Sequence, residues 1–104
     1  NWQMSFTCTE LAKIHLARAF IMNPEVLVLQ RPLMHYSQLQ SSRQHVLSLI
    51  RKHVDNRGLC LPAATLQRRR PGTCVFSTQS EADTLVADVV LRVSRDGSIE
   101  ATPR

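Results

Sequence analysis

The run Val-Leu-Val-Leu at Val26–Leu29 constrains the fold of this chain more than any other feature. Four consecutive apolar residues without alternation are typical of a strand buried on both faces, as in a parallel sheet between helices. The run ends abruptly at Gln30 and Arg31, and Pro32 then prevents further ladder pairing. The sequence therefore predicts a buried strand whose carboxyl end is polar.

A helical pattern precedes this strand, from Thr7 to Met22. Thr7 and Glu10 fit a Thr-x-x-Glu capping box, in which each side chain satisfies a free backbone N–H at the helix start. Asn23-Pro24 is expected to end the helix, because proline disfavours helical geometry in the residue before it. Apolar residues recur every three to four positions and predict the inward face: Leu11, Ile14, Ala17 or Arg18, and Ile21.

A second helix is predicted after the strand, from about Gln38 to Val54. Its inward face is expected to hold Leu39, Val46, Leu49 and Ile50. Arg51, Lys52 and His53 lie at its C-terminal end, where cations are favoured by the helix dipole.

The second half of the chain begins with an irregular segment at residues 55–72, rich in Pro and Gly at its flanks, which predicts a long loop. A second apolar strand is expected at residues 73–78. The segment 80–87 then predicts a short helix with Ala82, Leu85 and Val86 inward. Residues 89–93 and 98–101 predict a terminal hairpin around the turn Arg95-Asp96-Gly97. This order of helices and strands favours an α/β layered domain.

Length and composition fit one small domain or part of a larger one. The 104 residues are 43% hydrophobic, as in a globular chain, and contain no apolar run near the roughly 18 residues of a membrane span. No signal peptide is recognisable at the start. The three cysteines, Cys8, Cys60 and Cys74, suit neither a disulfide framework nor a zinc site and favour a reducing compartment.

The chain is basic, with 13 Lys and Arg against 8 Asp and Glu and a formal charge of +5. The densest basic run is Arg68-Arg69-Arg70. Such a run can attract phosphates, but a solvated loop is the favoured interpretation. One Trp and one Tyr provide little material for stacking single-stranded bases, so the sequence does not favour a nucleic-acid partner.

Two segments together resemble the C-terminal half of an ABC-type ATPase domain. "LARAFIMNPEVLVL", from Leu16 to Leu29, resembles the helix after the LSGGQ motif leading into the Walker B strand. "VFSTQSEADTLVADVVLRVSRDGSIE", from Val75 to Glu100, resembles the switch strand, short helix and closing hairpin. The order and spacing agree from Phe6 to Ile99. Residues 1–104 are therefore expected to form part of a P-loop NTPase-like layered domain, with parallel strands flanked by helices, a C-terminal β-hairpin and a basic insertion at 55–72.

The resemblance places LSGGQ on Phe6–Glu10. In the family this loop caps the γ-phosphate of ATP bound to the opposite subunit, through a hydroxyl, backbone N–H groups and a helix N-terminus. Thr7 keeps the hydroxyl, whereas Cys8 and Thr9 replace two glycines and make a close backbone approach sterically harder. Glu10 at the last position is a mild change.

The Walker B acids correspond to Gln30 and Arg31. The family's Asp holds Mg²⁺ through water, and its Glu orients or deprotonates the attacking water. Gln30 can hydrogen-bond a metal-bound water but brings no negative charge, while Arg31 stays protonated and opposes Mg²⁺. Ser37 takes the place of the D-loop Asp, and Gln79 that of the switch histidine, so neither charge nor proton relay is kept there.

The resemblance thus implies ATP and Mg²⁺ as cofactors, with nucleotide contacts from Thr7, Thr9, Glu10, Ser37 and Gln79. No catalytic position is intact, and these 104 residues contain no G-x-x-x-x-G-K-[ST] P-loop. The implied partners are a second nucleotide-binding domain and the transmembrane domains of a parent transporter, with a location in the cytoplasm or at the cytoplasmic face of a membrane.

The sequence therefore favours a degenerate ABC-type domain that acts as the non-hydrolysing member of a pair. Two alternatives stay open: a residually active ATPase in which Arg31 or an upstream group compensates for the missing acids, and a phosphate- or nucleic-acid-binding module built on Arg68-Arg69-Arg70.

Overall fold

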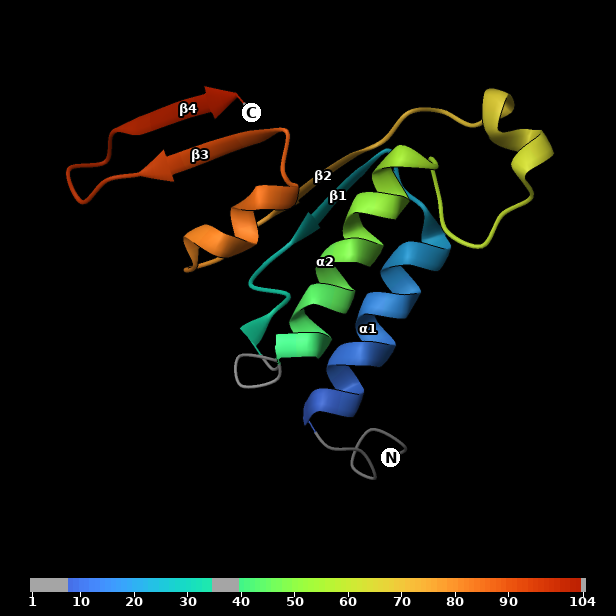
Figure 1. The fold of residues 1–104 in the computed structure, drawn as a ribbon, viewed down its shortest axis with the longest axis horizontal. Helices are drawn as coiled ribbons and strands as arrows, with labels where there is room; N and C mark the ends of the chain where they lie inside the picture. The colour runs from blue at the N-terminus through green and yellow to red at the C-terminus, as the bar shows by residue number, and fades with distance from the viewer. Residues whose placement is uncertain (1–7, 35–39, 104) are drawn as a thin grey trace.

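The computed structural model describes residues 8–34 and 40–103 as a small α/β fold (Figure 1). The helices and strands are α1 (Cys8–Met22), β1 (Val26–Leu29), α2 (Gln40–Asp55), β2 (Thr73–Phe76), β3 (Val89–Val93) and β4 (Ile99–Pro103). Two 3-10 helices, η3 (Ala63–Arg68) and η4 (Glu81–Val86), precede β2 and β3 respectively. No helix in the described part of the chain is both long and apolar enough to cross a bilayer.

The strands form two separate two-stranded sheets. β1 pairs with β2 in parallel, in a register that sets Val26 opposite Thr73 and Leu29 opposite Phe76. α2 lies between these strands in the chain, as expected because parallel neighbours need a long crossover connection. β3 and β4 form an antiparallel hairpin, with Val89 opposite Pro103. The predicted α/β layers, parallel pair and terminal hairpin are confirmed.

The hydrophobic core lies between the parallel pair and the two long helices. Its buried members come from α1, β1, the turn after β1, and α2: Phe20, Leu27, Leu33, Val46, Leu47 and Ile50. Cys74 and Phe76 of β2 pack against this cluster. Both helices therefore cover the same face of the parallel pair.

The opposite face of the parallel pair is bare among the described residues, which corrects the expectation of a strand buried on both faces. Val28 is 69% exposed, and Val26 and Val75 are also exposed. Successive side chains of a strand point to opposite faces, so the face that holds Leu27 is covered and the face that holds Val28 is not.

The buried face of α1 also differs from the prediction. Ile21 was expected to point inward but is 82% exposed, whereas Phe20 is buried with Leu16 and Ala19 beside it. Both stripes are apolar in the sequence and both have helical spacing, so periodicity alone could not choose between them. The predicted helix end is confirmed, because α1 stops at Met22 and Asn23 takes a left-handed φ of 46°.

The inward positions of α2 are confirmed for Val46 and Ile50, while Leu39 lies outside the described residues. His53, in contrast, is not an exposed cation at the helix end. It is buried against the ring of Phe20, with the two ring centroids 5.1 Å apart. Burial without a charged partner lowers the pKa of His53, so the neutral imidazole is the form that suits the core.

The segment 55–72 is more ordered than a plain loop, since it contains η3. Arg69 organises it by donating hydrogen bonds to the carbonyl oxygens of Asn56 and Pro62 and to the hydroxyl of Thr65. Arg57 in turn donates to the carbonyl oxygen of Arg69 at 3.0 Å. The basic residues of this segment thus satisfy backbone acceptors that a strand or helix would otherwise pair.

The short segment after β2 is a 3-10 helix whose inward residue is an acid. Ala82 and Leu85 were expected to point inward, but both are exposed, and Val86 is half-buried. Asp83 is instead buried, with 5% of its surface exposed. The tighter 3-10 winding changes which side chains share a face, so an α-helical pattern misplaced them.

Candidate functional site

The polar residues that follow β1 and β2 lie at one edge of the parallel pair. Because parallel strands end on the same side, Gln30 and Arg31 after β1 are brought beside Ser77–Gln79 after β2 (Figure 1). Two hydrogen bonds join the segments: the Arg31 N–H donates to Ser77 Oγ at 2.8 Å, and the Ser77 N–H donates to the Leu29 carbonyl oxygen at 3.2 Å. We call residues 30, 31 and 77–79 the carboxyl edge.

Arg31 holds an unusual backbone conformation at this edge. Its φ is 47°, in the left-handed region that costs a non-glycine residue free energy. The hydrogen bond to Ser77 and a turn in which Met34 N–H donates to the Arg31 carbonyl oxygen fix this conformation. The Arg31 side chain is exposed and has no ion-pair partner among the described residues. The edge therefore presents a fixed backbone and a cation that no described acid pairs with.

Asp83 lies next to the carboxyl edge, and its carboxylate is both hydrogen-bonded and ion-paired. The Asp83 carboxylate accepts a hydrogen bond from Thr78 Oγ1 at 2.7 Å and forms an ion pair with Arg43, in the first turn of α2. Thr78 Oγ1 also accepts a hydrogen bond from the Ser80 N–H. Arg43 Nε is buried and lacks a hydrogen-bond partner among the described residues. Arg43, Thr78 and Asp83 therefore tie α2, β2 and η4 together.

The chemistry of the carboxyl edge is that of amides, hydroxyls and one cation. Gln30 and Gln79 are both exposed and carry no charge. A general base needs a group that can take up a proton, and Mg²⁺ prefers carboxylate ligands. Asp83 is buried and already paired, so it can supply neither function. The residues present do not fit a bound Mg²⁺, and no hydrolytic step can be assigned to them.

The remaining residues that the sequence placed in a site are Thr7, Thr9, Glu10 and Ser37. Thr7 and Ser37 lie outside the described residues. Thr9 and Glu10 belong to the first turn of α1, where Glu10 is exposed. Within the described ranges, no three His, Cys, Asp or Glu residues lie close enough to hold a metal ion.

Sequence reasoning missed Arg43, Thr78 and Asp83. Asp83 was not among the inward residues predicted for the segment 80–87, and no role was predicted for Arg43 in the second helix. The sequence carries no local signal for their pairing, because 40 residues separate Arg43 from Asp83. Only the return of the chain through β2 brings them together.

The basic run of the 55–72 segment is partly engaged within the chain. Arg69 is bonded to backbone oxygens as described above, and Arg70 pairs with Glu25 next to β1. Arg68 ends η3 and is exposed. Two of the three arginines thus already have acceptors, which leaves a smaller free cationic surface than the sequence suggests.

Comparisons with known proteins give no match: no family model, no curated protein and no solved structure is significantly similar to this chain.

Proposed function

We propose that this chain is the C-terminal part of a degenerate ABC-type nucleotide-binding domain that pairs with a second such domain and does not hydrolyse ATP. The observation that carries the proposal is the composition of the carboxyl edge. Family resemblance assigns Gln30, Arg31 and Gln79 to three groups that must act on one phosphate and one water. Three such groups have to lie close together. The parallel pairing of β1 and β2 supports this, because it brings the carboxyl ends of both strands to the same edge.

The same edge supports the absence of turnover. An amide replaces the metal-holding acid, a guanidinium replaces the base, and an amide replaces the switch imidazole. A positioned general base alone contributes roughly 10²–10⁴-fold in rate. Losing that base together with the metal ligand removes the two effects on which phosphoryl transfer to water depends most. The role that fits these residues is to bind ATP without hydrolysing it and to pair with a second nucleotide-binding domain.

The role of the Arg31 side chain separates the alternative, a residually active enzyme, from the proposal. An exposed guanidinium with no ion-pair partner among the described residues can contact a phosphate, although it cannot activate water. If Arg31 is the compensating group in the alternative, turnover depends on this side chain.

The test uses the longer polypeptide that the proposal requires, in which a glycine-rich P-loop is expected roughly 80–150 residues before Phe6. Magnesium-dependent ATP turnover is measured for the wild type and for Arg31→Ala. The proposal expects both to be at the background of a protein-free reaction. Wild-type turnover that disappears in Arg31→Ala contradicts it, and so does unrelated sequence in place of the P-loop.

A further inference from the structure

A cavity of about 630 Å³ lies between α1 and α2, and the turn at residues 59 and 60 closes part of it. Its volume is within the range of roughly 300–1,000 Å³ that is typical of small-molecule sites. None of the residues of the carboxyl edge lines it. The cavity is therefore separate from the candidate site described above.

The floor of this cavity is the outer surface of the hydrophobic core. Phe20 and Val46 are buried members of the core cluster, and both line the cavity. The apolar floor is completed by three residues that pack against the cluster: Leu16, Leu49 and Leu59. An alkyl chain that lies on this floor extends the core and removes apolar surface from water.

The polar lining residues lie at one end of the cavity. Figure 1 shows α1 and α2 beginning on the same side of the molecule, and residues of both helices line the cavity. Lys13 belongs to the first half of α1, and the polar lining residues of α2 belong to its first half: Ser41, Ser42 and His45. Phe20 and Leu49 belong to later turns of the same helices. The cavity therefore has a polar end and an apolar end.

The polar end is suited to a single negative charge. Lys13 is exposed and has no ion-pair partner among the described residues. The described residues that line the cavity include no Asp or Glu. The serine hydroxyls and the His45 imidazole can donate hydrogen bonds to an anion beside the Lys13 ammonium group.

The number of cations at this end favours a carboxylate over a phosphate monoester. One lysine balances the single charge of a carboxylate, whereas a phosphate monoester carries about −1.5 to −2 at pH 7. Phe20 lies seven residues after Lys13, which is about 10 Å along the helix axis. The distance between the two ends specifies an elongated amphiphile.

We propose that the cavity between α1 and α2 binds a single-chain alkyl carboxylate of medium length, with its carboxylate at Lys13 and its alkyl chain along Phe20 and Leu49. The charge of the lining selects the head group, and the outer surface of the core accepts the chain.

Isothermal titration calorimetry of the 104-residue chain tests the ligand class with hexanoate, octanoate and decanoate below their micelle-forming concentrations. Each pair of methylenes that enters the cavity should tighten binding roughly ten-fold. Decyltrimethylammonium has the same tail and the opposite charge, and should bind at least about five-fold more weakly than decanoate. Decyl phosphate should bind no more tightly than decanoate.

Two substitutions test the two ends of the cavity. Lys13→Gln should weaken decanoate binding about two- to five-fold and leave the binding of decanol unchanged. Ala17→Phe enlarges an exposed side chain of α1 that lines the cavity, and should weaken the binding of both ligands at least about ten-fold by occupying the space of the alkyl chain. Circular dichroism checks that each variant keeps its helices.

Lys52→Gln is the matched control for Lys13→Gln. Lys52 is the other lysine of the chain, it is exposed, and it does not line the cavity. Its replacement removes the same charge and should leave the binding of both ligands unchanged. The two lysine variants decide the proposal if Ala17→Phe does not fold.

The thiol of Cys60 reports whether the ligand lies in this cavity. Cys60 is exposed and lines the cavity, whereas Cys74 lies in β2 and does not. Decanoate at ten times its dissociation constant should slow alkylation of Cys60 about five- to ten-fold by mass action, and leave alkylation of Cys74 unchanged.

Each contrary result overturns the proposal. Equal affinity for decanoate and decyltrimethylammonium shows a site without charge preference, and tighter binding of decyl phosphate assigns the polar end to a phosphate. Equal weakening by Lys13→Gln and Lys52→Gln assigns the effect to net charge. Alkylation of Cys60 that decanoate does not slow places the ligand elsewhere, and a chain that binds none of the carboxylates has no such site. ATP turnover does not enter this test, so its outcome is separate from that of the proposed function.

Discussion

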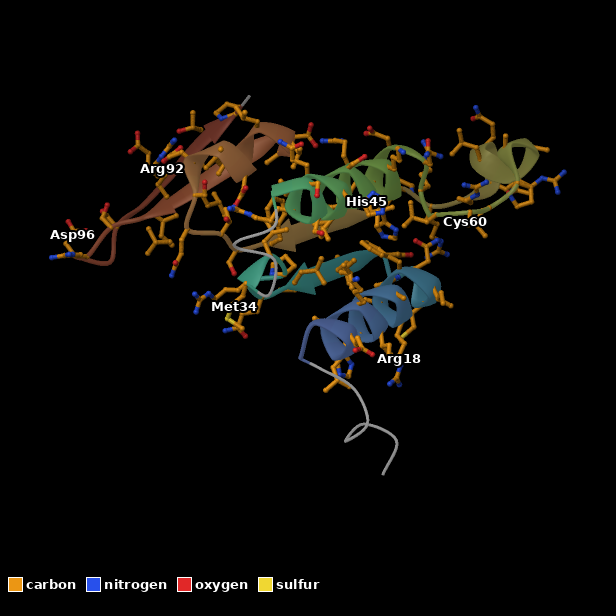
Figure 2. All side chains as sticks on the ribbon, turned by 60° about the horizontal axis from the view of Figure 1, so that its bottom comes forward. Arg18, Met34, His45, Cys60, Arg92 and Asp96 are labelled. Atoms are coloured by element: carbon orange, nitrogen blue, oxygen red, sulfur yellow. The ribbon has the colours of Figure 1, made fainter. Side chains whose placement is uncertain are left out.

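The parallel half of the molecule (α1, β1, α2 and β2) and the β3–β4 hairpin contain similar strand sequences but are buried very differently. β1 reads Val-Leu-Val-Leu and β3 reads Val-Val-Leu-Arg-Val. The parallel half contributes all six residues of the core cluster, whereas Val90 is the one residue of β3 and β4 that is buried. Figure 2 shows the consequence, with Arg92 and Asp96 on a hairpin that extends away from α1 and Arg18.

Apolar composition alone therefore does not decide which strands of this chain are buried. α1 and α2 lie against one face of β1 and β2, and no helix of the described part lies across the outer face of the hairpin. Hydrophobic stabilisation follows the apolar area removed from water, so it is concentrated where helices cover strands. The hairpin depends on side-chain anchors, of which Arg92–Glu81 and Arg51–Asp88 are ion pairs.

The largest effect is expected from one substitution made in both regions. Ile50→Ala removes a side chain that is 3% exposed and should lower the free energy of unfolding by about 2–5 kcal/mol. Ile99→Ala in β4, where the side chain is 66% exposed, should cost no more than about 1 kcal/mol. Urea unfolding followed by circular dichroism measures both.

Ile21→Ala is the matched control for this pair, because it is also on a helix but exposed, and should change stability by less than about 0.5 kcal/mol. Equal losses of unfolding free energy for Ile50→Ala and Ile99→Ala would show that the hairpin has a core of its own, and would contradict the difference in burial between the two regions.

A smaller effect is expected at the junction between the two regions. Asp83→Asn leaves the partly buried Arg43 guanidinium without its counter-charge and should cost about 2–3 kcal/mol. Glu25→Gln breaks the exposed pair with Arg70 and should cost less than about 0.5 kcal/mol. Denaturant titration in low and high salt measures the loss of unfolding free energy for each variant. Equal losses for Asp83→Asn and Glu25→Gln would mean that the Arg43–Asp83 ion pair does not fasten η4 to α2.

His53, buried in the core between α1 and α2, should make the stability of the fold depend on pH. Burial lowers the pKa of His53 below that of an unfolded histidine, about 6.5. The unfolded chain therefore binds the proton more readily, so the contribution of neutral His53 is complete above pH 6.5 and is lost as the pH falls through the lowered value. The free energy of unfolding should therefore decline as the pH falls below about 6.5.

His53→Leu should flatten this decline, and His45→Leu on the exposed side of α2 should leave it unchanged. Unfolding curves at a series of pH values give the slope for each variant. A decline of the same steepness in His53→Leu would place the titrating group elsewhere.

Sequence patterns predicted the elements well because their signals are local. The ends of α1 and β1 follow from Asn23-Pro24 and Gln30-Arg31, and the hairpin follows from Asp96-Gly97. What they missed depends on packing between distant elements. The buried stripe of α1 is set by contact with α2 and β1, and the exposed face of β1 reflects the absence of a covering layer among the described residues.

The candidate site divides in the same way. Gln30, Arg31 and Gln79 could be marked from the sequence because the family resemblance assigns them to Walker B and switch positions. Arg43 and Asp83 could not, since a buried ion pair across 40 residues leaves no trace in local periodicity. The positive φ of Arg31 was likewise not visible, because arginine is not a residue that signals a left-handed turn.

The most direct test of the proposed function introduces, at the carboxyl edge, the acids and the histidine that the proposed family carries there. The turnover assay on the longer polypeptide is repeated with Gln30→Asp, Arg31→Glu and Gln79→His combined, against the matched neutral variant Gln30→Asn, Arg31→Gln, Gln79→Asn. The account predicts that the restored variant gains magnesium-dependent ATP hydrolysis by at least about 10²-fold over wild type, because metal ligand, base and imidazole return together. A restored variant no faster than the neutral one would contradict the assignment of these three positions to an ATPase site.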